Sequence, residues 1–148
     1  VTSMGKMSFD NSARNNDISD PDATSNKSIP DGAEVYEING PFFFGVADML
    51  INTLERIGKV PQVFILRMRN VPAIDATGVH ALENFLISCN KNGTRLVLSG
   101  VNPEPYEILR KMHFIDMIGK ENVTDHIDKA LARTNEILAE IADKKSES

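Results

Sequence analysis

An aspartate that follows a strongly apolar run is the first residue in this chain whose type and position could support chemistry. Residues 63–68 form a run of β-forming residues with little polar alternation, which is typical of a central strand buried on both faces. The chain then turns at Val71-Pro72 and reaches Asp75, which precedes a helical pattern and can cap its first turn. Because α/β proteins usually place their sites where a buried strand feeds a helix, we expect a site at Asp75.

Phosphoacceptor chemistry is one role for an aspartate in this position, as in response-regulator receivers. A receiver also needs an acidic pair after its first strand and a lysine after a later strand, to hold a divalent ion and the phosphoryl charge. Here the first strand ends Ile38-Asn39-Gly40 and the later strand ends Ser99-Gly100, so both partners are missing. A helix cap is therefore the simpler interpretation of Asp75.

Other reactive side chains do not form a recognisable site. The histidines His80, His113 and His126 fall on different predicted helices at no ligand spacing, and Cys89 faces the predicted core. Ser99 follows a strand but lacks the Gly-x-Ser-x-Gly turn of a nucleophile elbow, and neither glycine-rich phosphate loop is present. We therefore expect no catalytic residue, no metal site and no cofactor.

Composition narrows the class of protein. The 148 residues are 41% hydrophobic and 25% charged, which suits one ordinary core. A formal net charge of -5 argues against a nucleic-acid partner, because phosphates demand a basic face. No apolar run in the sequence approaches the roughly 20 residues of a membrane helix. The single cysteine, Cys89, excludes an internal disulfide and favours a reducing compartment.

The sequence divides into three segments. Residues 1–31 are rich in Ser, Asn, Asp and Lys, and we expect a disordered linker because such a composition buries too little apolar surface. Residues 32–143 carry periodic apolar patterns and form the predicted domain. Residues 144–148 are expected to be a frayed tail.

Strand and helix patterns alternate within the predicted domain. Alternating or apolar β patterns predict strands at 33–39, 63–68 and 95–99, and Val123 adds one edge-strand residue. Helical spacing predicts helices over 46–57, 76–92, 103–112 and 125–143, with a packed connection around Gly119. Asn102-Pro103 predicts the start of the third helix, with Asn102 as its cap and Pro103 at its first position. Such alternation predicts an α/β fold with a mostly parallel sheet of about four to five strands, an antiparallel edge from the start of the domain, and about four to five covering helices.

Two motifs carry a family resemblance. Residues 74–79, Ile-Asp-Ala-Thr-Gly-Val after a buried strand, resemble the STAS domain, which occurs in anti-sigma-factor antagonists and in the cytoplasmic tails of sulfate-permease-type (SulP) anion transporters. Residues 36–47 contain a Gly-Pro-aromatic opening that looks like the SulP subfamily, and residues 98–102 are also similar to it. The resemblance covers about residues 32–141. The run Phe42-Phe43-Phe44 inside the second motif predicts a short buried strand or a loop plug.

The resemblance implies a domain that binds partners and catalyses nothing. Its expected partners are the membrane domain of its own transporter, a second copy or a soluble cytosolic protein, and its expected location is the cytoplasmic face of the membrane. The expected partner-binding loop is Asp75, Ala76, Thr77 and Gly78, with a docking surface formed by Pro41, Phe42, Phe44 and His80.

One departure from the family pattern separates the alternatives. The antagonists carry a phosphorylated serine directly after the motif aspartate, and here that position is Ala76. Thr77 is adjacent and could accept phosphate, although a threonine in a first helical turn also bonds locally. The departure favours a transporter tail over a free-standing antagonist. A nucleotide-binding or small-anion module using the amides at the Asp75 helix start is a further alternative, but it lacks a glycine-rich cradle, and Asp75 would repel an anion.

Overall fold

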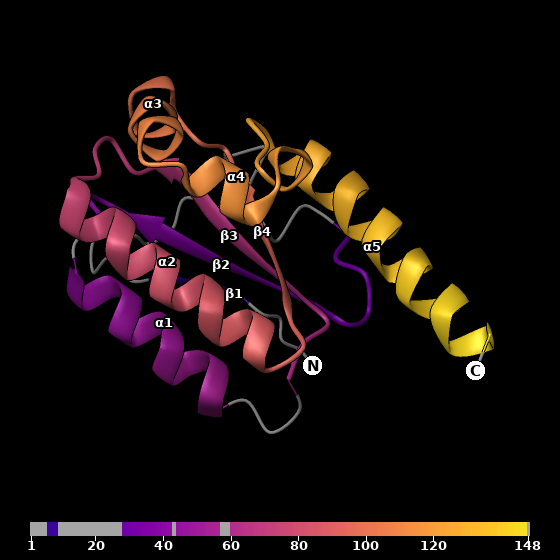
Figure 1. The fold of residues 1–148 in the computed structure, drawn as a ribbon. Helices are drawn as coiled ribbons and strands as arrows, with labels where there is room; N and C mark the ends of the chain where they lie inside the picture. Colours follow the sequence, from indigo (N-terminus) through magenta and orange to yellow (C-terminus); the bar gives the residue numbers. More distant parts are fainter. Residues whose placement is uncertain (1–5, 9–27, 43, 57–59, 148) are drawn as a thin grey trace.

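A parallel sheet with helices on both faces is the framework of this protein (Figure 1). The computed structural model describes residues 6–8, 28–42, 44–56 and 60–147. In chain order the elements are β1 (Lys6–Ser8), β2 (Ala33–Asn39), α1 (Phe44–Arg56), β3 (Val63–Asn70), α2 (Ala76–Lys91), β4 (Arg95–Ser99), α3 (Pro103–Lys111), α4 (Phe114–Ile118), the 3₁₀ turn η2 (Lys120–Asn122) and α5 (Ile127–Glu147). Their spatial order in the sheet is β1-β2-β3-β4.

Strand β3 lies between β2 and β4 and is buried along most of its length. Alternate residues serve opposite cores because a strand points successive side chains to opposite faces. Phe64 and Leu66 join a core formed with α1, α2, α3 and α4, whereas Val63 and Ile65 join a core formed with α5. Figure 1 shows α1 and α2 side by side over one face of the sheet. The prediction of a strand buried on both faces is confirmed.

The predicted α/β class with a mostly parallel sheet is confirmed, but the antiparallel edge is wrong. Every strand pairing in the described residues is parallel. Phe42 makes a single parallel bridge to Ile74, and Phe44 already begins α1, so neither of these two residues belongs to a second strand beside β2. The α1 crossover between β2 and β3 brings the chain back to the same end of the sheet, which makes the pairing parallel. Val123 does bridge to Leu98 at the outer edge of β4, as predicted.

Both ends of the predicted domain differ from expectation. Lys6–Ser8 pair with β2, and Ile29 packs against the α5-side core, so the expected linker over 1–31 is wrong at these positions. Pairing at a sheet edge uses backbone groups and needs no apolar composition. Helix α5 continues through Lys144 and Lys145 to Glu147, where we expected a frayed tail, and lysines in a last turn interact favourably with the helix dipole. Residues 9–27 lie outside the described part of the chain.

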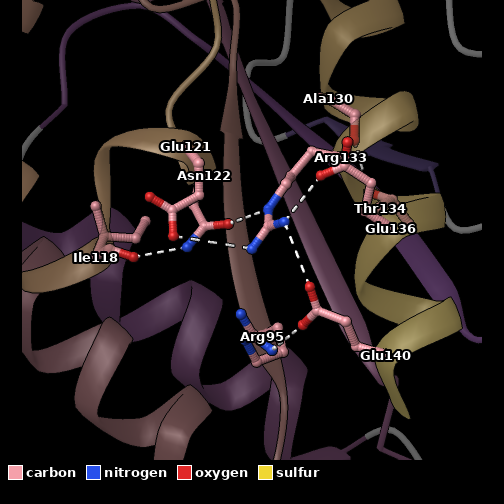
Figure 2. Close-up of polar contacts among 9 residues, drawn as sticks. All are labelled: Arg95, Ile118, Glu121, Asn122, Ala130, Arg133, Thr134, Glu136 and Glu140. Atoms are coloured by element: carbon pink, nitrogen blue, oxygen red, sulfur yellow. Dashed lines mark hydrogen bonds and ion pairs between the residues drawn. The ribbon is translucent and has the colours of Figure 1, made fainter. Parts of the chain in front are cut away.

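Side chains fix α5 to the corner between α4 and β4 (Figure 2). The Nε of Arg133 donates to Oδ1 of Asn122 at 2.8 Å, and Nδ2 of Asn122 donates to the Ile118 carbonyl at 2.7 Å. The guanidinium also lies 2.9 Å from Glu136, 3.8 Å from Glu140 and 3.9 Å from Glu121. Because Asn122 is buried, both ends of its amide need these partners. We call this set the Arg133 clasp.

Candidate docking loop

The connection from β3 to α2 begins with a tight turn. The Val71 amide donates to the Met68 carbonyl at 3.0 Å, and the Val71 side chain is fully buried. Pro72 and Ala73 are exposed, and Ile74 returns to the core. The chain therefore presents two small apolar residues between two buried anchors.

Asp75 caps helix α2, as the sequence predicted. Its backbone is extended, with φ -106 and ψ -179, and its Oδ1 accepts a hydrogen bond from the Gly78 amide at 2.8 Å. The Val79 amide donates to the Asp75 carbonyl at 2.9 Å, which starts the helix. Asp75, Ala76 and Thr77 are all exposed, so the carboxylate stabilises the helix end while it remains open to solvent.

Gly78 is buried in the first turn of α2, and close contact explains the residue type. A Cβ at this position would lie 2.6 Å from the Phe42 carbonyl oxygen and 2.8 Å from Cγ1 of Ile74. Both distances are below any ordinary contact, so a larger residue would push the helix away from the Phe42 segment. Gly78 therefore allows the first turn of α2 to pack closely against Phe42 and Ile74, and it offers no side chain to a partner.

The segment after β2 runs beside this loop. The Gly40 amide donates to the Asn70 carbonyl at 2.9 Å, and the Phe42 amide donates to the Ala73 carbonyl at 3.1 Å. Phe42 is fully buried, so the prediction of a buried aromatic is confirmed at this position. Its expected place on an exposed docking surface is wrong, because its ring fills the core. Pro41 is exposed as expected. Phe43 and the side chain of Phe44 lie outside the described residues.

The segment after β4 joins the same surface, which the sequence did not reveal. Asn102 occupies the N-cap position of α3, but its side chain makes no capping bond, so the prediction that this side chain caps the helix is wrong. Its Nδ2 instead donates to the Arg69 and Val71 carbonyls, each at 3.1 Å. Pro103 follows at the first helical position, as predicted, and is exposed. The Asn-Pro signal already accounted for a helix start, so nothing in the sequence indicated the contact with β3.

His80 and Cys89 have ordinary structural environments. His80 lies one turn into α2, with its side chain 65% exposed and its Nδ1 3.1 Å from Oε1 of Glu83. Cys89 is buried, and this burial raises the pKa of its thiol to about 12. The thiol is therefore protonated at neutral pH and is not a nucleophile there.

A separate cavity of about 300 Å³ opens between α3 and the start of α5. Its lining residues are Val101, Tyr106, Val123, Thr124, Asp125 and Lys129. Lys129 lies 3.0 Å from Asp125 and lowers the pKa of that carboxyl through their hydrogen bond. No residue of the β3–α2 loop lines this cavity. The described residues also contain no group of three or more His, Cys, Asp or Glu side chains placed to hold a metal ion.

Comparisons with known proteins identify the family. The family model of the STAS domain matches residues 24–130, and the chain belongs to this family. A sulfate transporter family protein from Wolinella succinogenes is 58% identical, covers 81% of this chain and 98% of its own, and superposes with a TM-score of 0.77. A SulP transporter STAS domain from Vibrio cholerae is 34% identical, with coverage of 76% and 88% and a TM-score of 0.69.

Two further comparisons show how far the similarity extends, in the length of the relative that is covered and in sequence identity. Protein YvdB of Bacillus subtilis, named as a candidate sulfate transporter, is 33% identical over 96 residues, which are 64% of this chain and 18% of that protein. This chain thus spans less than a fifth of that relative. A Thermotoga maritima protein described as a candidate anti-sigma factor antagonist is 17% identical, with a TM-score of 0.58, and shares the fold alone. None of the helices described in our structure combines the length and hydropathy that a bilayer span requires.

Proposed function

We propose that this chain is the cytosolic regulatory domain of a SulP-type anion transporter and works by docking without catalysis. Its main partner is the membrane domain of the same transporter, and it lies at the cytoplasmic face of the membrane. The single observation that carries the proposal is the 58% identity to a sulfate transporter family protein over 98% of that chain. The exposed stretch Asp75, Ala76 and Thr77 on a loop fixed by hydrogen bonds is the surface we propose for contact.

The same loop argues against a phosphorylation switch of the antagonist type. Ala76 has no hydroxyl, so the position that carries a serine in the antagonists cannot accept phosphate here. Thr77 is exposed and remains the one hydroxyl in this motif. A small-anion module is also disfavoured, because the Asp75 carboxylate already accepts the Gly78 amide at the start of α2. These residues support docking that does not depend on phosphorylation.

Removal of the domain from the full-length transporter tests the proposal. Deletion of residues 32–148 is expected to lower anion uptake, or the amount of transporter in the membrane, because a docked domain is lost. Uptake in vesicles, normalised to transporter protein, measures this. Glu55→Gln on α1 is the matched control: it should leave uptake unchanged, because Glu55 is exposed and lies outside the proposed contact surface. Unchanged uptake after the deletion, or a reading frame without membrane segments, would overturn the proposal in favour of a free-standing antagonist.

A further inference from the structure

Each of the three strands β2, β3 and β4 is followed by an exposed proline. These are Pro41 after β2, Pro72 after β3 and Pro103 after β4. In a parallel sheet all strands have their carboxyl ends at the same end of the sheet. The three connections therefore bring their prolines to the same end of the molecule. This repeated placement was not part of any motif noted in the sequence.

Hydrogen bonds join the three connections into one surface. Phe42 is bonded to Ala73, which ties the segment of Pro41 to that of Pro72. Asn102 donates to the Val71 carbonyl, which ties the segment of Pro103 to that of Pro72. The prolines therefore lie on neighbouring, mutually fixed segments. We define the proline platform as Pro41, Pro72, Ala73, Ala76 and Pro103, all of which are exposed.

The chemistry of this platform is small, apolar and poor in donors. Proline has no backbone N–H, and its ring fixes φ, so the platform loses little conformational entropy when a partner binds. Ala73 and Ala76 add only methyl groups. Such a surface suits the apolar side chains of a partner better than a polar ligand, which would find few hydrogen-bond donors there.

Unpaired acids border the platform. Asp75 lies between Ala73 and Ala76 in the chain, and Glu104 follows Pro103; both are exposed. Among the described residues neither carboxylate has an ion-pair partner, and the Asp75 side chain is engaged by the Gly78 amide alone. Arg69, a basic residue near the end of β3, already lies 2.9 Å from Glu37. The border therefore carries uncompensated negative charge around an apolar centre.

We infer that the proline platform binds a lysine- and arginine-rich protein segment that carries apolar side chains. The apolar groups would cover the prolines, and the cations would pair with Asp75 and Glu104. Cytoplasmic loops next to membrane helices carry an excess of Lys and Arg, so a loop of the transporter itself has this chemistry. An anionic lipid surface does not match the site, because its negative charge would be repelled by both acids. This inference rests on the proposed function and names the partner class of the same site.

Binding of the 148-residue chain to a short synthetic peptide of alternating lysine and leucine tests the inference. Amide chemical shifts followed by NMR should change first at Ala73, Ala76, Thr77 and Glu104, and the changes should weaken as salt is added. Asp75→Asn combined with Glu104→Gln should raise the Kd by about tenfold, at roughly a threefold effect per exposed charge pair. Asparagine keeps the helix cap, so the spectrum of the variant should otherwise remain that of the folded chain.

A charge-matched variant separates this site from general attraction to an acidic protein. Glu55→Gln combined with Asp143→Asn removes two other exposed acids, on α1 and α5, and should leave the Kd unchanged. Equal weakening by both double variants, or shift changes centred away from the platform, would overturn the inference. So would binding of the same residues to phosphatidylcholine–phosphatidylserine vesicles.

The two proposals can fail separately. If deletion of residues 32–148 leaves anion uptake unchanged, the proposed function fails regardless of the Kd measured for the peptide. If that deletion lowers uptake while the Asp75→Asn, Glu104→Gln chain binds peptide as tightly as the wild type, only the basic partner fails. A full-length transporter with these two substitutions should then transport normally.

Discussion

Two regions of this domain are held together by opposite means. At the Arg133 clasp, surface acids pair with a side chain of the same chain: Glu121, Glu136 and Glu140 all lie within 4 Å of one guanidinium (Figure 2). At the proline platform the connections are fixed mainly by backbone amides and by Asn102, and the acids Asp75 and Glu104 have no ion-pair partner among the described residues.

The difference indicates which surface is free to bind. Acids that already lie beside Arg133 attract a cation from outside less strongly, because the guanidinium offsets part of their negative charge. On the platform, Glu104 makes no ion pair among the described residues, and Asp75 can attract a cation while it keeps its capping bond to the Gly78 amide. A surface ordered by its backbone can therefore keep its side-chain charges available for a partner. The comparison predicts distinct effects of substitution in the two regions.

The largest effect is expected at Phe42, which joins the platform to the core. Phe42→Ala should lower the free energy of unfolding by about 3–5 kcal/mol, because a fully buried ring leaves a cavity. Denaturant unfolding followed by circular dichroism measures it. Pro41→Ala is the neighbouring control and should change stability by less than about 0.5 kcal/mol, since Pro41 is exposed. A small effect at Phe42 would mean that the platform is not anchored by this ring.

Gly78 is the next test of how closely the two loop segments approach. Gly78→Ala should cost about 1–3 kcal/mol, because the added methyl would meet the Phe42 carbonyl at 2.6 Å. Gly45→Ala in α1 is the matched control, since its added Cβ has no atom of the described residues within 4 Å, its chain neighbours and the backbone of its own helix aside. That substitution should leave stability unchanged or raise it by up to about 0.5 kcal/mol, because Gly45 is the second residue of α1 and the full helix-propensity gain applies to a helix interior. Equal gains at both glycines would contradict the close approach.

Local signals in the sequence were sufficient for the parts of this fold that depend on neighbours in the chain. The strands over 33–39 and 95–99 were predicted at their observed bounds, because alternation or apolar runs report burial directly. The Asp75 cap was likewise predicted, since the carboxylate and the Gly78 amide are three residues apart. Patterns of this range need no knowledge of the tertiary structure.

Contacts between distant segments were not accessible in the same way. Asn102 bonds to the Arg69 and Val71 carbonyls across more than thirty residues, and the Asn-Pro pair only indicated a helix start. Arg133 bonds to Asn122 from another element, and helical spacing alone does not place these two side chains together. Phe42 was assigned to a possible docking surface as well as to a buried plug, and burial decided between them. In each case a tertiary contact selects among several locally acceptable roles.

Substitution of Arg133 tests whether the Arg133 clasp, the region compared with the proline platform, stabilises the fold. Arg133→Ala should lower the free energy of unfolding by about 1–3 kcal/mol, because the buried Oδ1 of Asn122 loses its donor. Glu136→Ala removes only a partner that is 65% exposed and should cost less than about 1 kcal/mol. Unfolding midpoints of the two variants in the same buffer measure the contrast. Similar small losses would show that the clasp is a set of surface ion pairs with no buried component.

The smallest effect, and the one that separates stability from binding, is expected at Asp75. Asp75→Ala should cost about 0.5–2 kcal/mol, because the Gly78 amide loses its capping acceptor. Asp75→Asn keeps a capping oxygen and removes the charge, so its unfolding midpoint should stay close to that of the wild type.

The same pair of variants distinguishes the two uses of this residue. If the carboxylate both caps α2 and attracts a basic partner, the alanine variant loses stability and binding, whereas the asparagine variant loses only binding to the lysine–leucine peptide. If the charge matters for the helix alone, the asparagine variant should bind that peptide as tightly as the wild type. An alanine variant as stable as the wild type would instead mean that the 2.8 Å contact between Asp75 and the Gly78 amide contributes nothing to the fold. Because Asp75 carries no other polar contact among the described residues, these outcomes cannot be attributed to a second interaction of its side chain.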